Sequence, residues 1–390
     1  MTPAARTQAA IDVLDAIIAA AHAGGAAADT LIQRFFASRR YAGSKDRRAV
    51  RELVYAAIRA CGEPPASGRA AMLLLAAGDP VLAATFDGSP YGPAPIAAAE
   101  PVAVPGVVPA WLAERFAASG LDAVEWPALV ERAPLDIRVR RAIGREAIAA
   151  CIPGAEPVAG LDQALRLPSG TSVDPFAGEV EIQDAGSQAV SLAAMATLGM
   201  TVVDLCAGAG GKTLAIGDAM AGQGRIVACD TDRARLSRLP PRAARAGLDI
   251  VSTRLLDPGR EAAALADLAV TADVVFVDAP CSGTGTWRRN PEARWRLTPA
   301  RLARLVETQA RLLDVAAPLV RPGGALIHVV CSLLDEEGAA QVDGFLRRHS
   351  GWQAARLDLP FGTAHGAGRR LTPSRDGTDG FFVARLIAPC

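Results

Sequence analysis

The feature that most constrains the fold of this chain is a series of short apolar segments separated by segments with helical periodicity. The apolar segments have the length of buried strands, and the clearest are TVVDL (201–205), RIVACD (225–230), DVVFVDAP (273–280) and ALIHVVCS (325–332). Strands that alternate with helices form a parallel, doubly wound sheet. We therefore expect an α/β fold with such a sheet over residues 186–390.

The residues before this region indicate two further parts. Residues 1–62 and 66–83 have helical periodicity, and the Gly-, Pro- and Ala-rich stretch 85–108 is typical of a linker or a cover. We expect a helical domain with its linker over residues 1–125. A strand, a helix and extended chain then predict a small α/β subdomain over residues 126–185, which opens a second domain of residues 126–390.

Composition excludes several classes of protein. No stretch of about 18 apolar residues is free of charges or helix breakers, and the N-terminus lacks a signal-peptide pattern. The seven cysteines form no CxxC pair and have no histidine at ligand spacing. We therefore expect a cytoplasmic protein with no membrane association, no disulfide framework and no metal site.

The charge balance does not by itself indicate nucleic acid, because 41 basic and 41 acidic residues cancel. Nearly all of the positive charge is arginine, which is explained either by GC-rich coding or by contacts with phosphate. One basic cluster is either an RNA-facing edge or a solvated loop. Its members are Arg39, Arg40, Lys45, Arg47 and Arg48. In TWRRNPEARWRL (286–297), the tryptophans either stack on unpaired bases or pack the loop.

Cys281 and Cys331 differ from the other cysteines. They lie 50 residues apart, each is followed by serine, and each comes at the end of an apolar strand. Parallel strands would place both thiols at the carboxyl edge of one sheet, where open α/β proteins bind ligands. A thiolate there can attack an electron-poor ring. The remaining cysteines are expected to be structural or simply exposed: Cys61, Cys151, Cys206, Cys229 and Cys390.

A glycine-rich turn, LCAGAGGKT (205–213), joins a strand to a helix and is typical of a nucleotide-like cofactor site. It has neither the GxGxxG spacing of dinucleotide enzymes nor the GxxxxGKT spacing of a phosphate loop. Acidic residues that end strands are either helix caps or contacts for a cofactor with an adenosine part. They are Asp204, which could face an amino group of the cofactor, and then Asp230, Asp257 and Asp278.

Two cysteines beside a cofactor pocket suit methylation of cytosine at carbon 5. That carbon becomes nucleophilic only after a thiolate has added to carbon 6. An acid near ring nitrogen 3 stabilises the adduct, and Asp278 is placed for that role. Loss of the proton from carbon 5 then releases the thiol, so one cysteine can attack while the other assists release.

Five segments together resemble the RNA cytosine-carbon-5 methyltransferases of the Sun/Fmu type. They are EIQDAGSQ, DLCAGAGGKT, DAPCSGTGTWRRNPE, the Cys-Ser of HVVCSLLDEEG, and RLTPSRDGTDGFFVARL. The resemblance implies a Rossmann-like methyltransferase core that uses S-adenosylmethionine, with Cys331 as nucleophile and Cys281 as release cysteine. It also implies cofactor contacts from Cys206, Ala207, Gly208, Ala209, Gly210, Gly211, Lys212, Asp230, Asp257 and Asp278.

The first sixty residues resemble the NusB-like RNA-binding helical domain, which implies ribosomal small-subunit RNA (16S) as substrate and transfer RNA as the second choice. We expect a monomer. The chain departs from the family pattern at His328 and Val330, where tyrosine and threonine are usual, and at Gly208-Ala209, where alanine-proline is commoner. His328 is either a base or a core residue in the place of the tyrosine.

Two alternatives remain beside the RNA methyltransferase. One is a non-catalytic RNA-binding factor in ribosome assembly, which would have no need of the cysteine pair together with Asp278. The other is a small-molecule methyltransferase or dehydrogenase, which would have no use for a basic helical domain.

Overall fold

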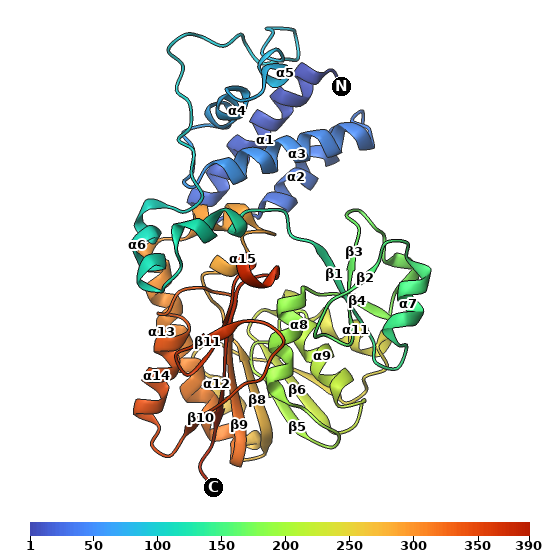
Figure 1. Cartoon of the computed structure of the whole chain (residues 1–390), viewed down its shortest axis with the longest axis vertical. Coiled ribbons are helices and arrows are strands. Elements are labelled where there is room, and N and C mark those ends of the chain that lie inside the picture. The colour runs from blue at the N-terminus through green and yellow to red at the C-terminus, as the bar shows by residue number, and fades with distance from the viewer. The chain divides into compact units, whose positions relative to one another are not determined.

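The computed structural model describes all 390 residues and divides into two compact units (Figure 1). The helical unit comprises Met1–Arg132 and Thr286–Pro299, and the sheet unit comprises Ala133–Gly285 and Ala300–Cys390. The expected division near residue 125 had left Thr286–Pro299 in the second domain, whereas here this segment is part of the helical unit. The division at residue 125 itself stays a prediction.

The helical unit is built on α1, which begins after Thr2 and ends at Gly24. The Thr2 hydroxyl accepts a hydrogen bond from the Ala5 amide, and Gly24 adopts φ +69°, a left-handed helix end that glycine favours. Leu14, Ile17 and Ile58 are fully buried in its core. The helices are α1 (Pro3–Ala23), α2 (Ala28–Ala37), α3 (Ser44–Ala60), α4 (Gly68–Ala76), α5 (Pro80–Ala83) and α6 (Ala110–Ala118), with 3-10 helices η1 (Ala123–Leu129) and η6 (Pro291–Arg296).

The sheet unit begins with a small antiparallel sheet in the order β2-β3-β1-β4. Its strands are β1 (Leu135–Val139), β2 (Glu156–Pro157), β3 (Ala164–Leu167) and β4 (Val180–Ile182). The helix α7 (Arg145–Cys151) contributes Ile148 to a core that it shares with Ile137 and Leu165. The 3-10 helix η2 (Asp174–Phe176) precedes β4.

The main sheet has nine strands in the order β11-β12-β13-β9-β8-β5-β6-β7, with β10 paired to β13. The five strands β7, β6, β5, β8 and β9 are parallel, and β13 runs antiparallel to β9. The bounds are β5 (Thr201–Asp204), β6 (Arg225–Asp230), β7 (Val251–Leu255), β8 (Ala272–Asp278), β9 (Val320–Val330), β10 (Gln353–Ala355), β11 (Thr363–His365), β12 (Gly368–Leu371) and β13 (Phe381–Ile387). The prediction of a doubly wound α/β sheet is confirmed, with an antiparallel extension.

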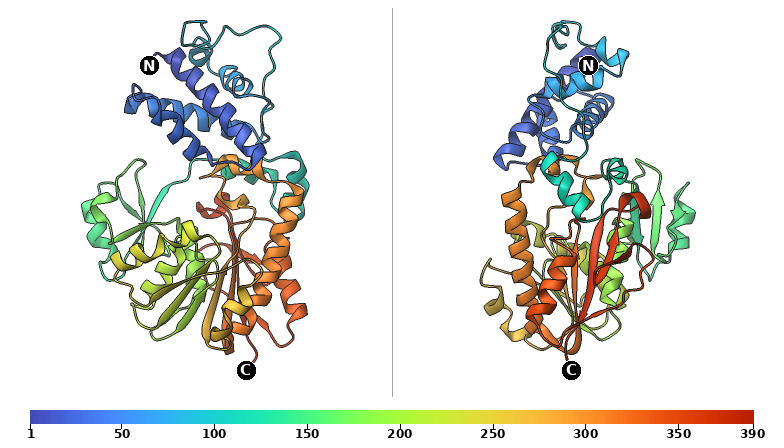
Figure 2. Two further views of the ribbon diagram at one scale, coloured as in Figure 1. Left: turned by 180° about the vertical axis from the view of Figure 1, so that it is seen from behind. Right: turned by 60° about the vertical axis from the view of Figure 1, so that its left-hand side comes forward.

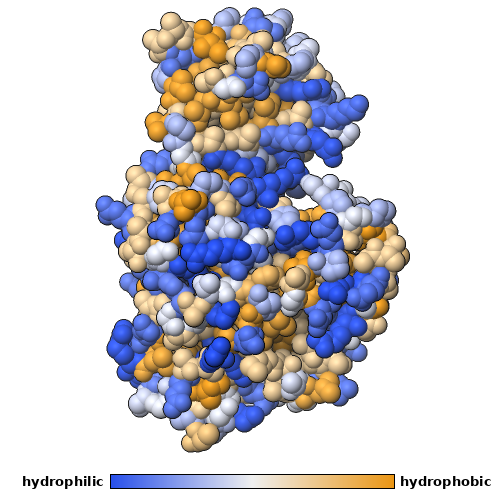
Figure 3. Space-filling view, in the orientation of Figure 1, coloured by the Kyte–Doolittle hydropathy of each residue, from blue (hydrophilic) through white to orange (hydrophobic).

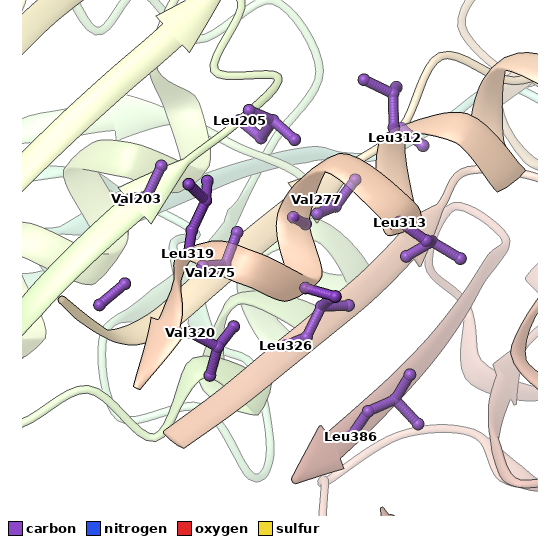
Figure 4. Packing of buried hydrophobic residues seen from close by; sticks show 14 of the residues in the cluster. Val203, Leu205, Val275, Val277, Leu312, Leu313, Leu319, Val320, Leu326 and Leu386 are labelled. Carbon is purple, nitrogen blue, oxygen red and sulfur yellow. The ribbon is translucent and has the colours of Figure 1, made fainter. Parts of the chain in front are cut away.

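Helices cover both faces of this sheet (Figure 2). Successive residues of a strand point to opposite faces, so Val275 belongs to the buried cluster that includes Leu313 of α13 (Figure 4), while Val274 belongs to the cluster on the other face, which includes Ile216 of α9. This two-sided burial explains the continuous apolar runs in the sequence. The helices are α8 (Ala185–Ser191), α9 (Gly211–Ala219), α10 (Arg233–Leu236), α11 (Leu239–Arg245), α12 (Glu261–Ala264), α13 (Pro299–Ala316), α14 (Ala339–Arg348) and α15 (Pro373–Asp376), with 3-10 helices η3 (Leu192–Ala194), η4 (Ala266–Leu268), η5 (Thr284–Thr286) and η7 (Ala317–Leu319).

None of the helices combines the length and the apolar character that a membrane span requires.

Candidate active site at the carboxyl edge of the sheet

Two thiols lie in contact where β8 and β9 end. Cys281 follows β8 and Cys331 follows β9, and these parallel strands are paired so that Asp278 lies opposite Val329. The two Sγ atoms are 3.3 Å apart, within hydrogen-bonding distance, and both cysteines are free. Each side chain is partly exposed. Both thiols are therefore close enough to act on the same atom of a bound molecule.

A partly buried ion pair lies at the same edge. Lys212, in the first turn of α9, places its Nζ 2.6 Å from the Oδ2 atom of Asp278 at the end of β8. Burial alone would lower the pKa of Lys212, but the Asp278 carboxylate outweighs it and raises that pKa. The lysine is therefore held as an ammonium ion. Phe381, whose ring centroid is 5.4 Å from Nζ, covers it.

The serines that follow the two cysteines are joined to each other. The hydroxyl oxygens of Ser282 and Ser332 lie 3.1 Å apart, and that of Thr284 lies 3.2 Å from Ser332. All three side chains are buried. This hydroxyl cluster ties the turn after β8 to the turn after β9, and so fixes the distance between the thiols.

The glycine-rich turn between β5 and α9 is held in place by contacts with Leu239 and Asp230. Its left-handed residues are Gly208 (φ +55°) and Gly210 (φ +89°), and a Cβ at Gly210 would lie 2.1 Å from Leu239 Cδ1. The Gly208 amide donates to Asp230 Oδ2 at 2.6 Å. A Cβ at Gly211, by contrast, would meet nothing within 4 Å. The turn thus leaves open space beside the first residue of α9, where helix amides are free for an anionic or polar group.

The Asp204 carboxylate, at the end of β5, shows whether the residues beside the turn suit a cofactor with an amino group. Its Oδ2 accepts a hydrogen bond from the Thr213 hydroxyl at 2.6 Å, while its Oδ1 is buried with no partner. Burial raises the pKa of this carboxyl to about 7. A buried acceptor without a donor is costly, and an ammonium group would satisfy it. The residues present therefore fit such a cofactor.

The other acidic residues at strand ends differ in their surroundings. Asp230 accepts backbone amides with both carboxylate oxygens, from Gly208 and from Asp232 at 2.7 Å, and is nearly buried. Asp257, just after β7, has an exposed side chain. Cys206, at the start of the turn, is partly buried, and this burial raises the pKa of its thiol well above the usual value. It therefore has the character of a packing residue.

Most of the sheet unit matches one known protein family. A model of the family described as "16S rRNA methyltransferase RsmB/F" matches residues 195–387. This chain belongs to the RsmB/F methyltransferase family. The Synechocystis protein described as "Probable ribosomal RNA small subunit methyltransferase B" is 36% identical over 242 residues, which is 59% of this chain and 53% of the relative.

Two proteins named "Ribosomal RNA small subunit methyltransferase B" match over more of the chain. That of Salmonella arizonae is 33% identical over 292 residues and that of Xanthomonas campestris 34% over 300 residues, in each case 72% of this chain and 66% of the relative. The chain thus spans between about half and two thirds of the length of these RsmB/F relatives.

Solved structures share the fold. The crystal structure of PH0851 superposes with a TM-score of 0.73 at 23% identity and covers 99% of both chains. NSun6 from Pyrococcus horikoshii, solved with SFG, gives 0.64 at 19% identity over 72% of this chain and 98% of its own.

His328, which stands where the family usually has tyrosine, is a core residue. It is fully buried in β9, and its Nε2 lies 2.9 Å from the carbonyl oxygen of Glu337. Burial lowers its pKa to about 4, so the ring is neutral near pH 7 and Nε2 donates its proton to that carbonyl. The geometry favours the core interpretation over the interpretation as a base.

Glu337 belongs to the site and was not predicted. It is fully buried, accepts the Ser282 amide at 2.8 Å, and also accepts the Ser282 hydroxyl. Gln309 of α13 donates to it at 3.0 Å and to the Pro280 carbonyl at 2.9 Å. The only sequence signal was its place in the DEEG run after Cys331, where an acidic residue would ordinarily be exposed.

Arg294 and the two tryptophans of Thr286–Pro299 pack inside the helical unit. Trp287 and Trp295 are buried, and the Trp295 indole donates to the Cys61 carbonyl at 3.0 Å. Arg294, 1% exposed, donates to the carbonyls of Ile58 and Cys61 at 2.6 and 2.7 Å. Of the two interpretations of this segment, packing is therefore the one that the structure supports for both tryptophans.

Proposed function

We propose that this chain is an S-adenosylmethionine-dependent RNA methyltransferase that forms 5-methylcytosine, with 16S ribosomal RNA as its substrate. The observation that carries the proposal is the contact between the Cys281 and Cys331 thiols beside the Lys212–Asp278 pair. A thiol pair of this kind is not needed by a protein that only binds RNA. Membership of the RsmB/F family supports the same conclusion.

The cofactor would bind over the glycine-rich turn. When bound, S-adenosylmethionine supplies an electrophilic methyl group. The candidate contacts from Cys206 to Lys212 lie on the turn and the first residues of α9, and the unpartnered Oδ1 of Asp204 can accept from its amino group. Asp230 ends β6 and Asp257 follows β7, on the side where the ribose and base would lie.

Cys331 attacks carbon 6 of the target cytosine. The thiolate sulfur supplies the electron pair of the new S–C bond, and the π electrons of the carbon 5–carbon 6 double bond pass to carbon 5 and, by conjugation, to ring nitrogen 3. The Lys212–Asp278 pair holds a proton between Nζ and Oδ2 that can be shared with that nitrogen. Preorganised charge of this type stabilises the adduct without reorganisation of solvent. Carbon 5 can then accept the methyl group.

Release reverses the addition. A base removes the proton from carbon 5, the carbon 5–carbon 6 double bond forms again, and Cys331 leaves as a thiolate. Cys281, whose Sγ lies 3.3 Å from that of Cys331, can stabilise the departing sulfur through its S–H group. This division of labour assigns attack to Cys331 and release to Cys281.

The helical unit offers a surface that suits RNA. A groove of about 1000 Å³ on this unit is lined by six arginines and only two acidic residues, with Phe36 and Tyr55 among its apolar lining. Hydrophilic side chains gather on this part of the unit (Figure 3). Arginine contacts phosphates bidentately, and aromatic rings suit unpaired bases. The arginines are Arg47, Arg48, Arg51, Arg59, Arg132 and Arg289.

The test is transfer of labelled methyl groups from S-adenosylmethionine to small-subunit ribosomal RNA, both naked and in particles. Wild type should label cytosine at carbon 5, and Cys331→Ala should not, although it should bind the cofactor as wild type does. Label on transfer RNA alone would replace the substrate but keep the chemistry. Cofactor binding without transfer to any RNA would contradict the proposal and favour a non-catalytic assembly factor.

A further inference from the structure

The Glu337 side chain contacts the turn that follows β8, and all of its hydrogen-bond donors are neutral groups. Its carboxylate accepts the amide and hydroxyl of Ser282 and the side-chain amide of Gln309. No lysine, arginine or histidine forms an ion pair with it. Because a carboxylate can only accept, three donors around one carboxyl satisfy the ionised form. A buried negative charge without a counter-ion acts strongly on its neighbours.

The two thiols face different charges. Cys281 precedes Ser282, whose amide donates a hydrogen bond to the Glu337 carboxylate. The pKa of Cys281 is raised by its hydrogen bond with Cys331, by burial and by the charge of Glu337. Cys331 is among the groups that raise the pKa of Lys212, whose ammonium group is paired with Asp278. Cys281 is thus linked through Ser282 to an acidic group, whereas Cys331 lies close enough to a basic group to affect its pKa.

We propose that Glu337 is a positioning residue that makes Cys331, rather than Cys281, the nucleophile. Its carboxylate holds Cys281 as a thiol that donates its S–H to the Cys331 sulfur, and it anchors the Ser282 turn. Cys331 gives its own proton to solvent, and the resulting thiolate forms the bond to carbon 6. The inference rests on the proposed function for its biological meaning, but the difference between the thiols belongs to the protein alone.

The test measures alkylation of each thiol by iodoacetamide, with no cofactor and no RNA present. Initial rates at Cys281 and Cys331 are read separately by peptide mass spectrometry. Wild type should react faster at Cys331, since the thiolate is the nucleophile. In Glu337→Gln, which keeps the shape and removes the charge, the preference for Cys331 should fall about tenfold, as expected for a change of one pKa unit. Glu337→Asp should restore most of it.

Glu307→Gln, on the exposed side of α13, is the matched control and should leave the preference unchanged. If Glu337→Gln does not fold, the pH dependence of the two wild-type alkylation rates takes its place, and the rate at Cys331 should rise at a lower pH than the rate at Cys281. An unchanged preference in folded Glu337→Gln, or a rate at Cys281 that rises at the same pH as that at Cys331 or at a lower pH, would overturn the inference. Absence of methyl transfer by a wild type that shows the preference would count against the proposed function alone.

Discussion

The carboxyl edge of the sheet and the segment Thr286–Pro299 both concentrate reactive or charged side chains, but these side chains face different partners. At the edge, the Cys281 and Cys331 thiols face each other, 3.3 Å apart. In the segment, the Arg294 guanidinium and the Trp295 indole face backbone carbonyls at the C-terminal end of α3. Groups that face each other in partly open space can act on a third molecule, whereas groups that satisfy buried carbonyls are already used.

The comparison has a practical consequence for mutations. Changes at Cys281, Cys331 and Asp278 should alter chemistry and have little effect on folding, because these side chains are partly exposed. Changes in the segment should do the opposite. The arginines of the groove on the helical unit form a third case, in which affinity for RNA should change and neither chemistry nor folding should.

The largest effect is expected at Asp278. Asp278→Asn removes the charge that holds the Lys212 ammonium group in place, so stabilisation of the adduct is lost. We expect the rate of methyl transfer to fall about a hundredfold or more, with only a small loss of stability, because both side chains of the ion pair are partly exposed. Single-turnover methyl transfer and thermal unfolding, measured on the same preparation, check both halves. If the loss in the free energy of unfolding were as large as the rise in the activation free energy of methyl transfer, the carboxyl edge would not differ from Thr286–Pro299 in the way described.

Arg294→Ala should have the converse effect. It removes the donor to the carbonyls of Ile58, Arg59 and Cys61, all of which are in the helical unit. Buried acceptors without donors are costly, and we expect a loss of about 3 kcal/mol in the free energy of unfolding. Denaturant unfolding measures it, with the exposed Arg304→Ala as control. A loss no larger than that of the control would show that the segment does not support the helical unit.

His328 predicts a pH dependence of stability. Its pKa in the folded protein is lowered to about 4 by burial, from an ordinary value of 6.5. Between these values the unfolded chain binds a proton that the folded chain does not. The free energy of unfolding should therefore fall as the pH falls through this range, by about 3 kcal/mol in total.

The measurement is denaturant unfolding from pH 7 to pH 4. His328→Gln keeps a donor for the Glu337 carbonyl but cannot titrate, so its stability should depend less on pH than that of wild type. Replacement of the exposed His22 by glutamine is the control. The same slope in His328→Gln as in wild type would mean that other groups carry the pH dependence.

The smallest effect is expected in the groove. Arg48→Ala removes one of its six arginines and should weaken RNA binding about threefold to tenfold, with a salt dependence reduced by about one ion. Methyl transfer at saturating RNA should not change. Arg34→Ala, on exposed α2 surface outside the groove lining, is the matched control. If Arg48→Ala and Arg34→Ala weakened RNA binding equally, the groove would not be the RNA-binding surface.

Much of this organisation was predictable from local patterns. Apolar runs of strand length, such as ALIHVVCS, predicted the parallel sheet because both of its faces are buried. The position of Cys281 and Cys331 at strand ends followed from the same runs. What the sequence could not show depends on contacts between distant residues.

Three features illustrate this limit. The antiparallel direction of β13 depends on the connection through α15, which periodicity does not report. The burial of Arg294 depends on the carbonyls at the end of α3, more than 200 positions away. Glu337 is adjacent to Glu336 in a run that looks solvated, and only its contacts with Ser282 and Gln309 identify it as part of the site.

The most direct test of the central claim is to map the covalent adduct. Cys281→Ala, incubated with S-adenosylmethionine and small-subunit ribosomal RNA, should accumulate a protein–RNA complex that resists denaturation, because attack proceeds and release is slowed. After digestion, peptide mass spectrometry should find a methylated cytidine nucleotide on Cys331. The double variant with Cys331→Ala should form no adduct. An adduct at any other residue, or methyl transfer that survives in Cys331→Ala, would contradict the account.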